Sequence, residues 1–240
     1  MRSNIKTSNP DFLFSLTGFG LQLLYLFLNV FPPRITPRER EALLQNDSEF
    51  QADETFHVPN VGSVVGGLLI SGVVRTGDQL AVGPFEDGSF KYVTVKSVHR
   101  NKVPCRLVRA GESATLAVAA DAPLRRGMVL LSPRTPEPVL HQYTCLYFQA
   151  RLHVLHHPTA IYAGFQATCY VANIRQTAVV IAMMGKRRLE TNETASVMLK
   201  FLCHPEFIRP ASRLLLREGD SKAIGHVTQV FALPSRQSDK

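Results

Sequence analysis

The chain has 240 residues and a mass of 26.7 kDa, enough for one or two domains whose cores fold without metal or disulfide staples. Hydrophobic residues make up 45% and charged residues 19% of the sequence. This globular composition excludes disordered, collagen-like and low-complexity proteins. The 27 Lys and Arg residues outnumber the 19 Asp and Glu residues, so the net charge of +8 favours a polyanionic partner without identifying it.

The spacing of cysteine and histidine argues against a metal or redox site. The cysteines lie tens of residues apart, with no Cys-x-x-Cys pair, at Cys105, Cys145, Cys169 and Cys203. We therefore predict buried, reduced thiols in an intracellular protein. His153, His156 and His157 have no carboxylate or cysteine at metal-ligand spacing, so no metal site is predicted.

Residues 12–31 form an uncharged run that follows Arg2 and Lys6 and is long enough to span a bilayer. One interpretation is a signal anchor. Polar residues and glycines dilute the run, however, and Pro32-Pro33 ends a helix there, which leaves about 14 good helical positions. We therefore predict a core helix that packs on more than one side against other parts of the chain, and no membrane association.

Residues 36–49 are predicted to form a linker with a helical turn that begins at Thr36-Pro37. After residue 50 the sequence changes to short segments rich in Val, Ile, Leu and Thr, broken by Gly, Asp, Asn and Pro. Pro133, Pro136 and Pro138 favour a stiff connection between two series of such segments. The first series of predicted strands comprises residues 63–70, 73–74, 79–82, 90–98, 113–119 and 128–131.

A second series of predicted strands follows at residues 144–155, 166–171, 178–183, 195–202, 213–217 and 225–231. Short strands with regular turns and little helix indicate an all-β protein, and closing each series into a barrel removes exposed strand edges. We therefore predict two consecutive small antiparallel β-barrels preceded by one apolar amino-terminal helix. The predicted parts are residues 1–35 (apolar helix), 36–49 (linker), 50–134 (first barrel), 141–234 (second barrel) and 235–240 (tail).

Ordered motifs in the first barrel resemble those of the elongation-factor-Tu-like translational GTPases. A proline turn and a glycine-tolerant strand at residues 58–67 (VPNVGSVVGG) precede Gly72 and the turn Thr76-Gly77-Asp78. Arg109-Ala110-Gly111-Glu112 and residues 124–130 (LRRGMVL) are similar to two further segments of the family. The resemblance implies that residues 50–134 form the β-barrel that the family has as its domain II.

The second barrel is similar to the family's domain III at His204-Pro205-Glu206 and at residues 217–227 (REGDSKAIGHV). Residues 96–100, 154–159 and 174–178 narrow the resemblance to the branch of GTP-binding proteins one and two. Residues 15–21 (SLTGFGL) look like the entry into the last helix of the family's GTPase domain, so residues 1–35 are interpreted as a remnant of that helix. The resemblance covers roughly residues 15–232.

The family's nucleotide-binding motifs are missing from this sequence. It contains no G-x-x-x-x-G-K-[ST] loop, whose backbone amides and Lys hold phosphates, and no D-x-x-G. Asn101-Lys102-Val103-Pro104 has proline in place of the carboxylate that reads guanine. We therefore predict that this chain neither binds nor hydrolyses GTP and holds no cofactor, whereas GTP and Mg²⁺ are the cofactors of the full-length family.

The resemblance also implies a groove for the aminoacyl end of tRNA on the first barrel. Asp53, Glu54 and Phe56 occupy the positions of an acidic-aromatic loop, His57 follows, and Ser113 stands where relatives often have Asn. The carboxylates would accept hydrogen bonds from an α-ammonium group while Phe56 stacks on the terminal base. The alternative is that Asp53 and Glu54 are solvated charges at a strand edge and Phe56 belongs to the core.

For the second barrel the resemblance implies contacts with the backbone of the acceptor and T stems, which involve no reading of sequence. The alternative is that these residues are solvated turn residues, with Arg175 packed against the neighbouring barrel and residues 185–188 forming a solvated hairpin tip. The candidate contacts, by residue type and expected loop position, are Gln166, Arg175, Gln176, Thr177, Lys186, Arg187, Lys222 and His226.

These features together predict the tRNA- and ribosome-contacting, carboxy-terminal part of a cytoplasmic translational GTPase that serves in elongation or ribosome rescue. The expected partners are tRNA, the ribosome and the GTPase domain of the full-length protein, and neither DNA nor a membrane. One alternative is a GTPase-less short isoform or degenerate copy that acts as a protein-interaction module. A membrane anchor at residues 12–31 is the other alternative.

Overall fold

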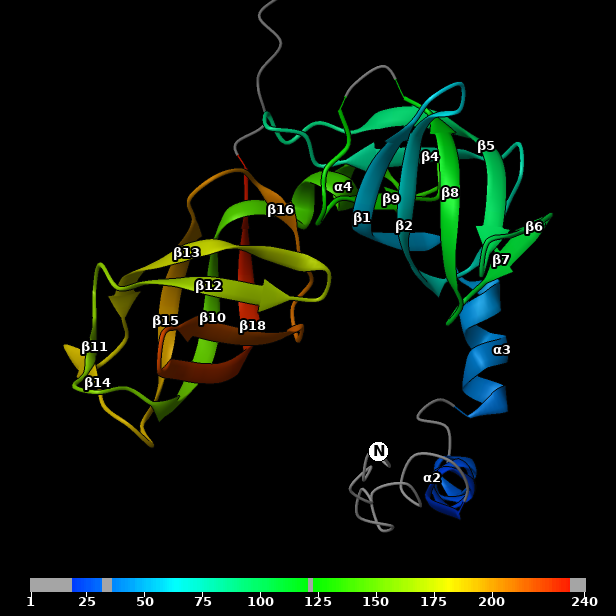
Figure 1. Ribbon diagram of the computed structural model, residues 1–240. Coiled ribbons are helices and arrows are strands. Elements are labelled where there is room, and N and C mark those ends of the chain that lie inside the picture. Colours follow the sequence, from blue (N-terminus) through cyan, green and yellow to red (C-terminus); the bar gives the residue numbers. More distant parts are fainter. Residues whose placement is uncertain (1–18, 32–35, 121–122, 234–240) are drawn as a thin grey trace, which may run out of the picture. The chain divides into compact units, whose positions relative to one another are not determined.

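The computed structural model describes residues 19–31, 36–120 and 123–233 (Figure 1). Contacts within the chain divide it into two units, residues 1–40 and residues 41–240. The second unit holds both β-sheet bodies. Most of the motif at residues 15–21 and the tail at residues 235–240 lie outside the described residues.

Helix α2 spans Phe19–Val30, where the sequence predicts an apolar helix. Its large apolar side chains are exposed, from 54% for Leu24 to 79% for Val30. Within the first unit, these side chains are left without cover by the described residues. Cover by other parts of the chain stays a prediction. No helix in the described ranges is both long and apolar enough to cross a membrane.

Helix α3 spans Pro37–Gln45, where the sequence predicts a single turn. Thr36 and Glu39 form a capping box at its start: Thr36 N donates to Glu39 Oε2 at 2.8 Å, and Glu39 N donates to Thr36 Oγ1 at 3.2 Å. These bonds satisfy amide groups that the first turn of a helix leaves without partners. The helix therefore begins where predicted and continues further.

The first β-sheet body is a closed ring of six strands with short additions (Figure 1). Its order is β4-β9-β1-β2-β8-β5, and β4 pairs with β5 to close the ring. Strand β6 pairs with β5, and β3 pairs with β7. Buried side chains such as Phe50, Leu69 and Leu116 fill the interior. The strands are β1 (Glu49–Val58), β2 (Gly62–Ser71), β3 (Val73–Arg75), β4 (Gln79–Gly83), β5 (Lys91–Arg100), β6 (Val103–Cys105), β7 (Leu107–Arg109), β8 (Ser113–Ala119) and β9 (Val129–Leu131).

The second body follows the short helix α4 (Glu137–Gln142) and also closes. Its ring has the order β15-β13-β12-β17-β18-β10 and closes through pairing of β10 with β15, while β16 pairs with β10 and β11 with β14. Phe148, Leu152 and Phe201 are among its fully buried side chains. The strands are β10 (Thr144–His156), β11 (Ile161–Tyr162), β12 (Gln166–Val171), β13 (Ile174–Met183), β14 (Arg188–Leu189), β15 (Thr194–Phe201), β16 (Glu206–Phe207), β17 (Arg213–Glu218) and β18 (Ser221–Ala232).

These bodies confirm the predicted all-β fold of two consecutive barrels. The sequence predicts none of the short strands β6, β7, β11, β14 and β16, and strands β1 and β13 also differ from the prediction. Strand β1 lies across the predicted linker boundary. Only Phe50 and Ala52 of this strand are buried, so the alternation of apolar and polar residues is too short to predict a strand from the sequence. Strand β13 begins at Ile174, whereas the sequence predicts a start at residue 178. The prediction misses the first residues because polar side chains interrupt the apolar pattern there.

Asn173, in the turn between β12 and β13, connects the two barrels. Its side-chain Nδ2 donates to Ala52 O at 3.2 Å and to Met128 O at 2.9 Å, and the residue is buried. Ala52 N also donates to Met128 O at 3.0 Å. Asn173 of the second barrel therefore fixes the part of β1 that immediately precedes Asp53.

A buried ion pair also joins the barrels. Arg125 Nη1 donates to both carboxylate oxygens of Glu206 at 2.9 and 3.0 Å, and its Nη2 donates to Pro84 O and Pro205 O. Gln176 Nε2 donates to Glu206 Oε1 at 2.7 Å. An apolar cluster that draws residues from both barrels and from α4 consists of Val129, Leu131, Leu140 and Phe207.

Candidate functional site

A groove of about 440 Å³ on the first barrel brings together three of the five residues predicted there. We call it the first-barrel groove. Asp53 and Glu54 of β1 and Ser113 of β8 line it. The other lining residues are Gly66, Gly67, Asn101, Lys102, Ala114, Thr115 and Arg126.

A β-bulge presents both carboxylates to the groove. The pairing of β1 with β2 shifts register between Ala52, which pairs with Gly67, and Glu54, which pairs with Gly66. Asp53 has no pairing partner in β2. Consecutive residues of a regular strand point to opposite faces, whereas a bulge re-aims one of them. Asp53 and Glu54 therefore belong to a bulged strand, which corrects the loop expected from the sequence.

The cationic side of the first-barrel groove comes from segments that are distant in the sequence. Asn101 and Lys102 have φ values of 51° and 66° and form the tight turn between β5 and β6. Arg126 precedes β9 and is exposed. Lys102 and Arg126 are not predicted for this site from the sequence, because only closure of the ring brings them beside β1.

Asp53 titrates in a mixed environment. Burial raises the pKa of its carboxyl above the ordinary value, Arg126 opposes this shift by its positive charge, and Glu54 adds to it by its negative charge. A cation placed in the first-barrel groove would offset both the burial and the repulsion from Glu54. The groove therefore offers carboxylates for a cationic group and, beside them, cations for an anionic group.

Phe56 lies beside the groove and is 51% exposed, so the interpretation of Phe56 as a core residue is wrong. A Cβ atom at position 66 would lie 3.8 Å from Phe56 Cε2, which places the ring next to the groove floor. His57 is exposed and does not line the groove. An exposed ring at this place is suited to stacking against a base.

The predicted contacts on the second barrel lie in strands and not in loops, except Lys186 and Arg187. Gln166 begins β12, Arg175, Gln176 and Thr177 belong to β13, and Lys222 and His226 belong to β18. The guanidinium carbon of Arg175 lies 5.6 Å from the ring centre of Tyr170 in its own barrel. The structure therefore does not bring this set together as one site.

Gln176 has a role within the protein. It is buried, and its Nε2 donates to His204 O at 3.0 Å as well as to Glu206. Its Oε1 accepts from Cys203 N at 3.2 Å. Both the amide nitrogen and the amide oxygen of Gln176 are therefore hydrogen-bonded where the two barrels meet.

Lys186 and Arg187 lie in the segment between β13 and β14. These two strands pair with different neighbours, so the segment is not the tip of a hairpin. The interpretation of residues 185–188 as a hairpin tip is therefore wrong. Lys186 Nζ forms an ion pair with Glu193 Oε1 at 2.5 Å, and Arg187 is exposed. Arg187 forms no ion pair with another described residue.

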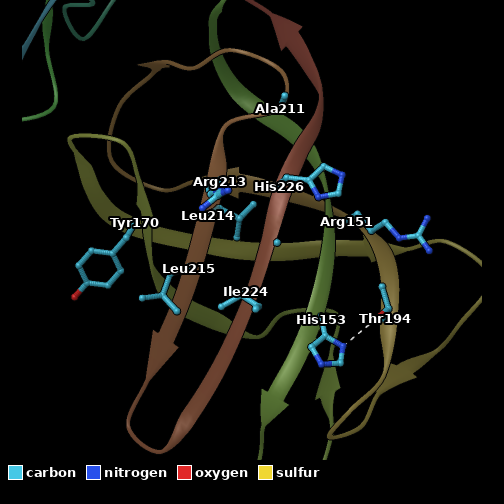
Figure 2. A pocket seen from close by; sticks show the side chains of 11 residues that line it. Arg151, His153, Tyr170, Thr194, Ala211, Arg213, Leu214, Leu215, Ile224 and His226 are labelled. Carbon is cyan, nitrogen blue, oxygen red and sulfur yellow. Dashed lines mark hydrogen bonds between the residues drawn. The ribbon is translucent and has the colours of Figure 1, made fainter. Parts of the chain in front are cut away.

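A larger groove of about 770 Å³ lies on the second barrel and was not predicted (Figure 2). We call it the second-barrel groove. Only His226 of its lining was a candidate. The alternating pattern in Arg151-Leu152-His153, with Leu152 buried, indicates that Arg151 and His153 point outward. The sequence therefore contained a signal for part of this groove, although not for its assembly from several strands.

The described residues include no group of three or more His, Cys, Asp and Glu side chains placed to hold a metal ion. Cys145 and Cys169 are buried, whereas Cys203 is exposed. Burial raises the pKa of the Cys169 thiol to about 12, which keeps it protonated and unreactive at neutral pH.

Comparison with known proteins supports the motif-based resemblance. A family model described as elongation factor Tu domain 2 matches residues 62–131. The GTP-binding protein 2 sequences of Mus musculus and Homo sapiens are each 46% identical over 228 residues, which cover 94% of this chain and 37% of the relative. GTP-binding protein 1 of Xenopus laevis is 38% identical over 219 residues, 90% of this chain and 32% of the relative.

The chain thus spans a little over a third of the length of the GTP-binding protein 2 relatives. The match to the domain 2 model falls within the ring that carries the first-barrel groove. Along nearly its whole length, therefore, the chain is a homologue of GTP-binding protein 2, and residues 62–131 of its first barrel match elongation factor Tu domain 2.

Proposed function

We propose that the chain is the tRNA- and ribosome-contacting part of a translational GTPase and that its first-barrel groove holds the aminoacylated end of a tRNA. The observation that carries this proposal is the meeting of Asp53, Glu54 and Arg126 in one groove. An aminoacylated RNA end carries both an α-ammonium group and phosphates. A groove with charges of both signs complements such an end, and the half-exposed Phe56 beside it offers a stacking surface.

The proposal concerns binding and includes no nucleotide chemistry, because the phosphate-loop and guanine-reading motifs do not occur in these 240 residues. GTP and Mg²⁺ would act in the full-length protein of the family. We place this activity in the cytoplasm, in elongation or in the rescue of ribosomes. On the second barrel, Arg175, Thr177 and Arg187 are the residues proposed to contact RNA backbone.

The test compares one tRNA in its aminoacylated and deacylated forms, by filter binding to the 240-residue chain at several salt concentrations. We expect affinity to fall steeply with salt, because phosphate contacts release counterions. The aminoacylated form should bind about tenfold more tightly, since a charged hydrogen bond contributes roughly 1.5–3 kcal/mol.

Variants test the acidic side and the cationic side of the first-barrel groove separately. The double variant Asp53→Asn, Glu54→Gln should abolish the preference for the aminoacylated form, and Arg126→Ala should weaken both forms equally. Glu86→Gln, an exposed carboxyl of the same barrel that does not line the groove, is the matched control. Equal binding of both forms by the parent chain would overturn the aminoacyl assignment, and loss of salt dependence would overturn RNA binding as a whole.

A further inference from the structure

A row of basic residues, which we call the cationic row after its two arginines, crosses three neighbouring strands of the second barrel. Arg151 of β10 pairs with His226 of β18, which pairs with Arg213 of β17. Residues directly opposite one another in antiparallel strands point to the same face. All three are exposed, and neither arginine forms an ion pair with a described residue. Figure 2 shows the three side chains along one side of the second-barrel groove.

An apolar row lies next to this cationic row. Ile224 of β18 pairs with Leu215 of β17, which pairs with Tyr170 of β12. These residues are two positions along their strands from the cationic row, so they share its face. Ile224 is 43% and Leu215 is 37% exposed, and Figure 2 shows them side by side.

A second cationic row borders the apolar row on its other side. Arg217 of β17 pairs with Lys222 of β18. Both are exposed, and both lie two positions beyond Leu215 and Ile224. An aliphatic strip therefore lies between two rows of positive charge on one face of the barrel.

This arrangement is costly for the free protein. Arg217 and Lys222 carry like charges directly opposite one another on neighbouring strands, which is destabilising. Exposed aliphatic side chains gain free energy when another surface covers them. None of the described residues that line the second-barrel groove is acidic. A ligand with carboxylates and apolar side chains would relieve both costs at once.

The aliphatic strip favours an acidic polypeptide over a nucleic acid as the anionic ligand of this face. Nucleic-acid bases stack on flat aromatic rings or guanidinium planes. At the centre of this strip are the branched side chains of Leu215 and Ile224, which offer no flat surface, and the Tyr170 ring already contacts Arg175. Leucine or phenylalanine side chains fit such a strip, while flanking carboxylates can bond to the arginines.

We propose that the second-barrel groove is a docking site for an acidic segment of a partner protein, in which carboxylates alternate with large apolar side chains. The apolar side chains cover Ile224 and Leu215, and the carboxylates pair with Arg151, Arg213 and Arg217. This proposal is independent of tRNA binding at the first-barrel groove, since no residue lines both grooves.

The experiment measures fluorescence anisotropy of a short labelled peptide of alternating aspartate and leucine, titrated with the 240-residue chain. Ile224→Ser and Arg213→Glu are each expected to weaken binding at least about tenfold. Ile181→Ser is a matched control, because Ile181 is also 43% exposed and lies outside the groove. Arg106→Glu, at an exposed residue of the first barrel, is the control for charge reversal.

Two probes distinguish the ligand classes. A peptide with serine in place of leucine should bind at least about tenfold more weakly, and an oligouridylate of similar length should not displace the aspartate-leucine peptide. Equal binding of the serine peptide would overturn the proposal, because the apolar strip would then have no role. Displacement by oligouridylate combined with insensitivity to Ile224→Ser would assign the face to RNA instead. Leu215→Ser provides a second test of the strip if Ile224→Ser fails to fold.

Discussion

Glu206 is a carboxyl group whose surroundings make its negative charge costly. The residue is 2% exposed. Burial raises its pKa from 4.5 to about 7, although Arg125 and Gln176 lower it through charge and hydrogen bonds. Because the pKa is higher in the folded state than in the unfolded chain, the folded state binds this proton more tightly. The contribution of Glu206 to stability is therefore full below about pH 4.5 and is lost as the pH rises to about 7.

The Glu206→Gln variant removes this titration. Relative to the variant, the parent chain should lose on the order of 1–3 kcal/mol of unfolding free energy between about pH 4.5 and about pH 7, and then no more. Urea unfolding at a series of pH values measures the difference. Burial lowers the pKa of nearby His204, so His204 titrates with the opposite sign, and the series is repeated in a His204→Asn background. A difference that is constant with pH in both backgrounds would contradict the assignment.

At the scale of strands, β1 and β2 approach so closely at Gly67 that no side chain fits there. A Cβ atom at position 67 would lie 1.9 Å from Gln51 O, whereas one at position 66 would meet its nearest neighbour at 3.8 Å. Gly67→Ala must therefore move backbone, and we expect it to destabilise the chain by at least about 1–3 kcal/mol. Gly66→Ala should cost less than about 1 kcal/mol. Thermal unfolding compares the two variants, and equal losses would show that the contact at Gly67 does not limit the packing.

Strand patterns were readable from the sequence where apolar alternation is long. Strand β15, for example, alternates buried and outward residues over its full length, and the sequence predicted it within one residue at each end. Strand β1 lacks such a run because its outward positions hold Asp53, Glu54 and their polar neighbours. The residues that make β1 functionally interesting are the ones that hide it as a strand. The same holds for the start of β13, where Arg175 and Gln176 interrupt the pattern.

At the scale of the whole molecule, residue types could be predicted but not their assembly into sites. The resemblance to translational GTPases selected Asp53, Glu54 and Ser113, and the structure places all three in one groove. It did not select Lys102 or Arg126, because their positions depend on ring closure. The cationic row of the second-barrel groove depends on the register of three strands, β10, β18 and β17, and register cannot be read from the composition of any one strand.

Helix α2 is expected to make the whole chain self-associate. Its large apolar side chains from Leu21 to Phe31 are each more than half exposed, and exposed apolar patches mark sites of association. The barrels have cores of their own in residues 41–240, so a variant that lacks residues 1–35 should still fold. We expect this variant to stay monomeric in sedimentation velocity at concentrations where the full chain forms larger species.

A full-length variant with Leu21→Gln, Leu24→Gln and Leu28→Gln tests whether apolarity is the cause. Because these leucines are all more than half exposed, their replacement removes apolar surface without opening a cavity. This variant should match the truncated chain in its sedimentation profile, while both keep the circular dichroism and the unfolding transition of the barrels. If the truncated chain associates as strongly as the full chain, the associating surface lies on the barrels, and the exposed Ile224 and Leu215 of the second-barrel groove become the first residues to replace.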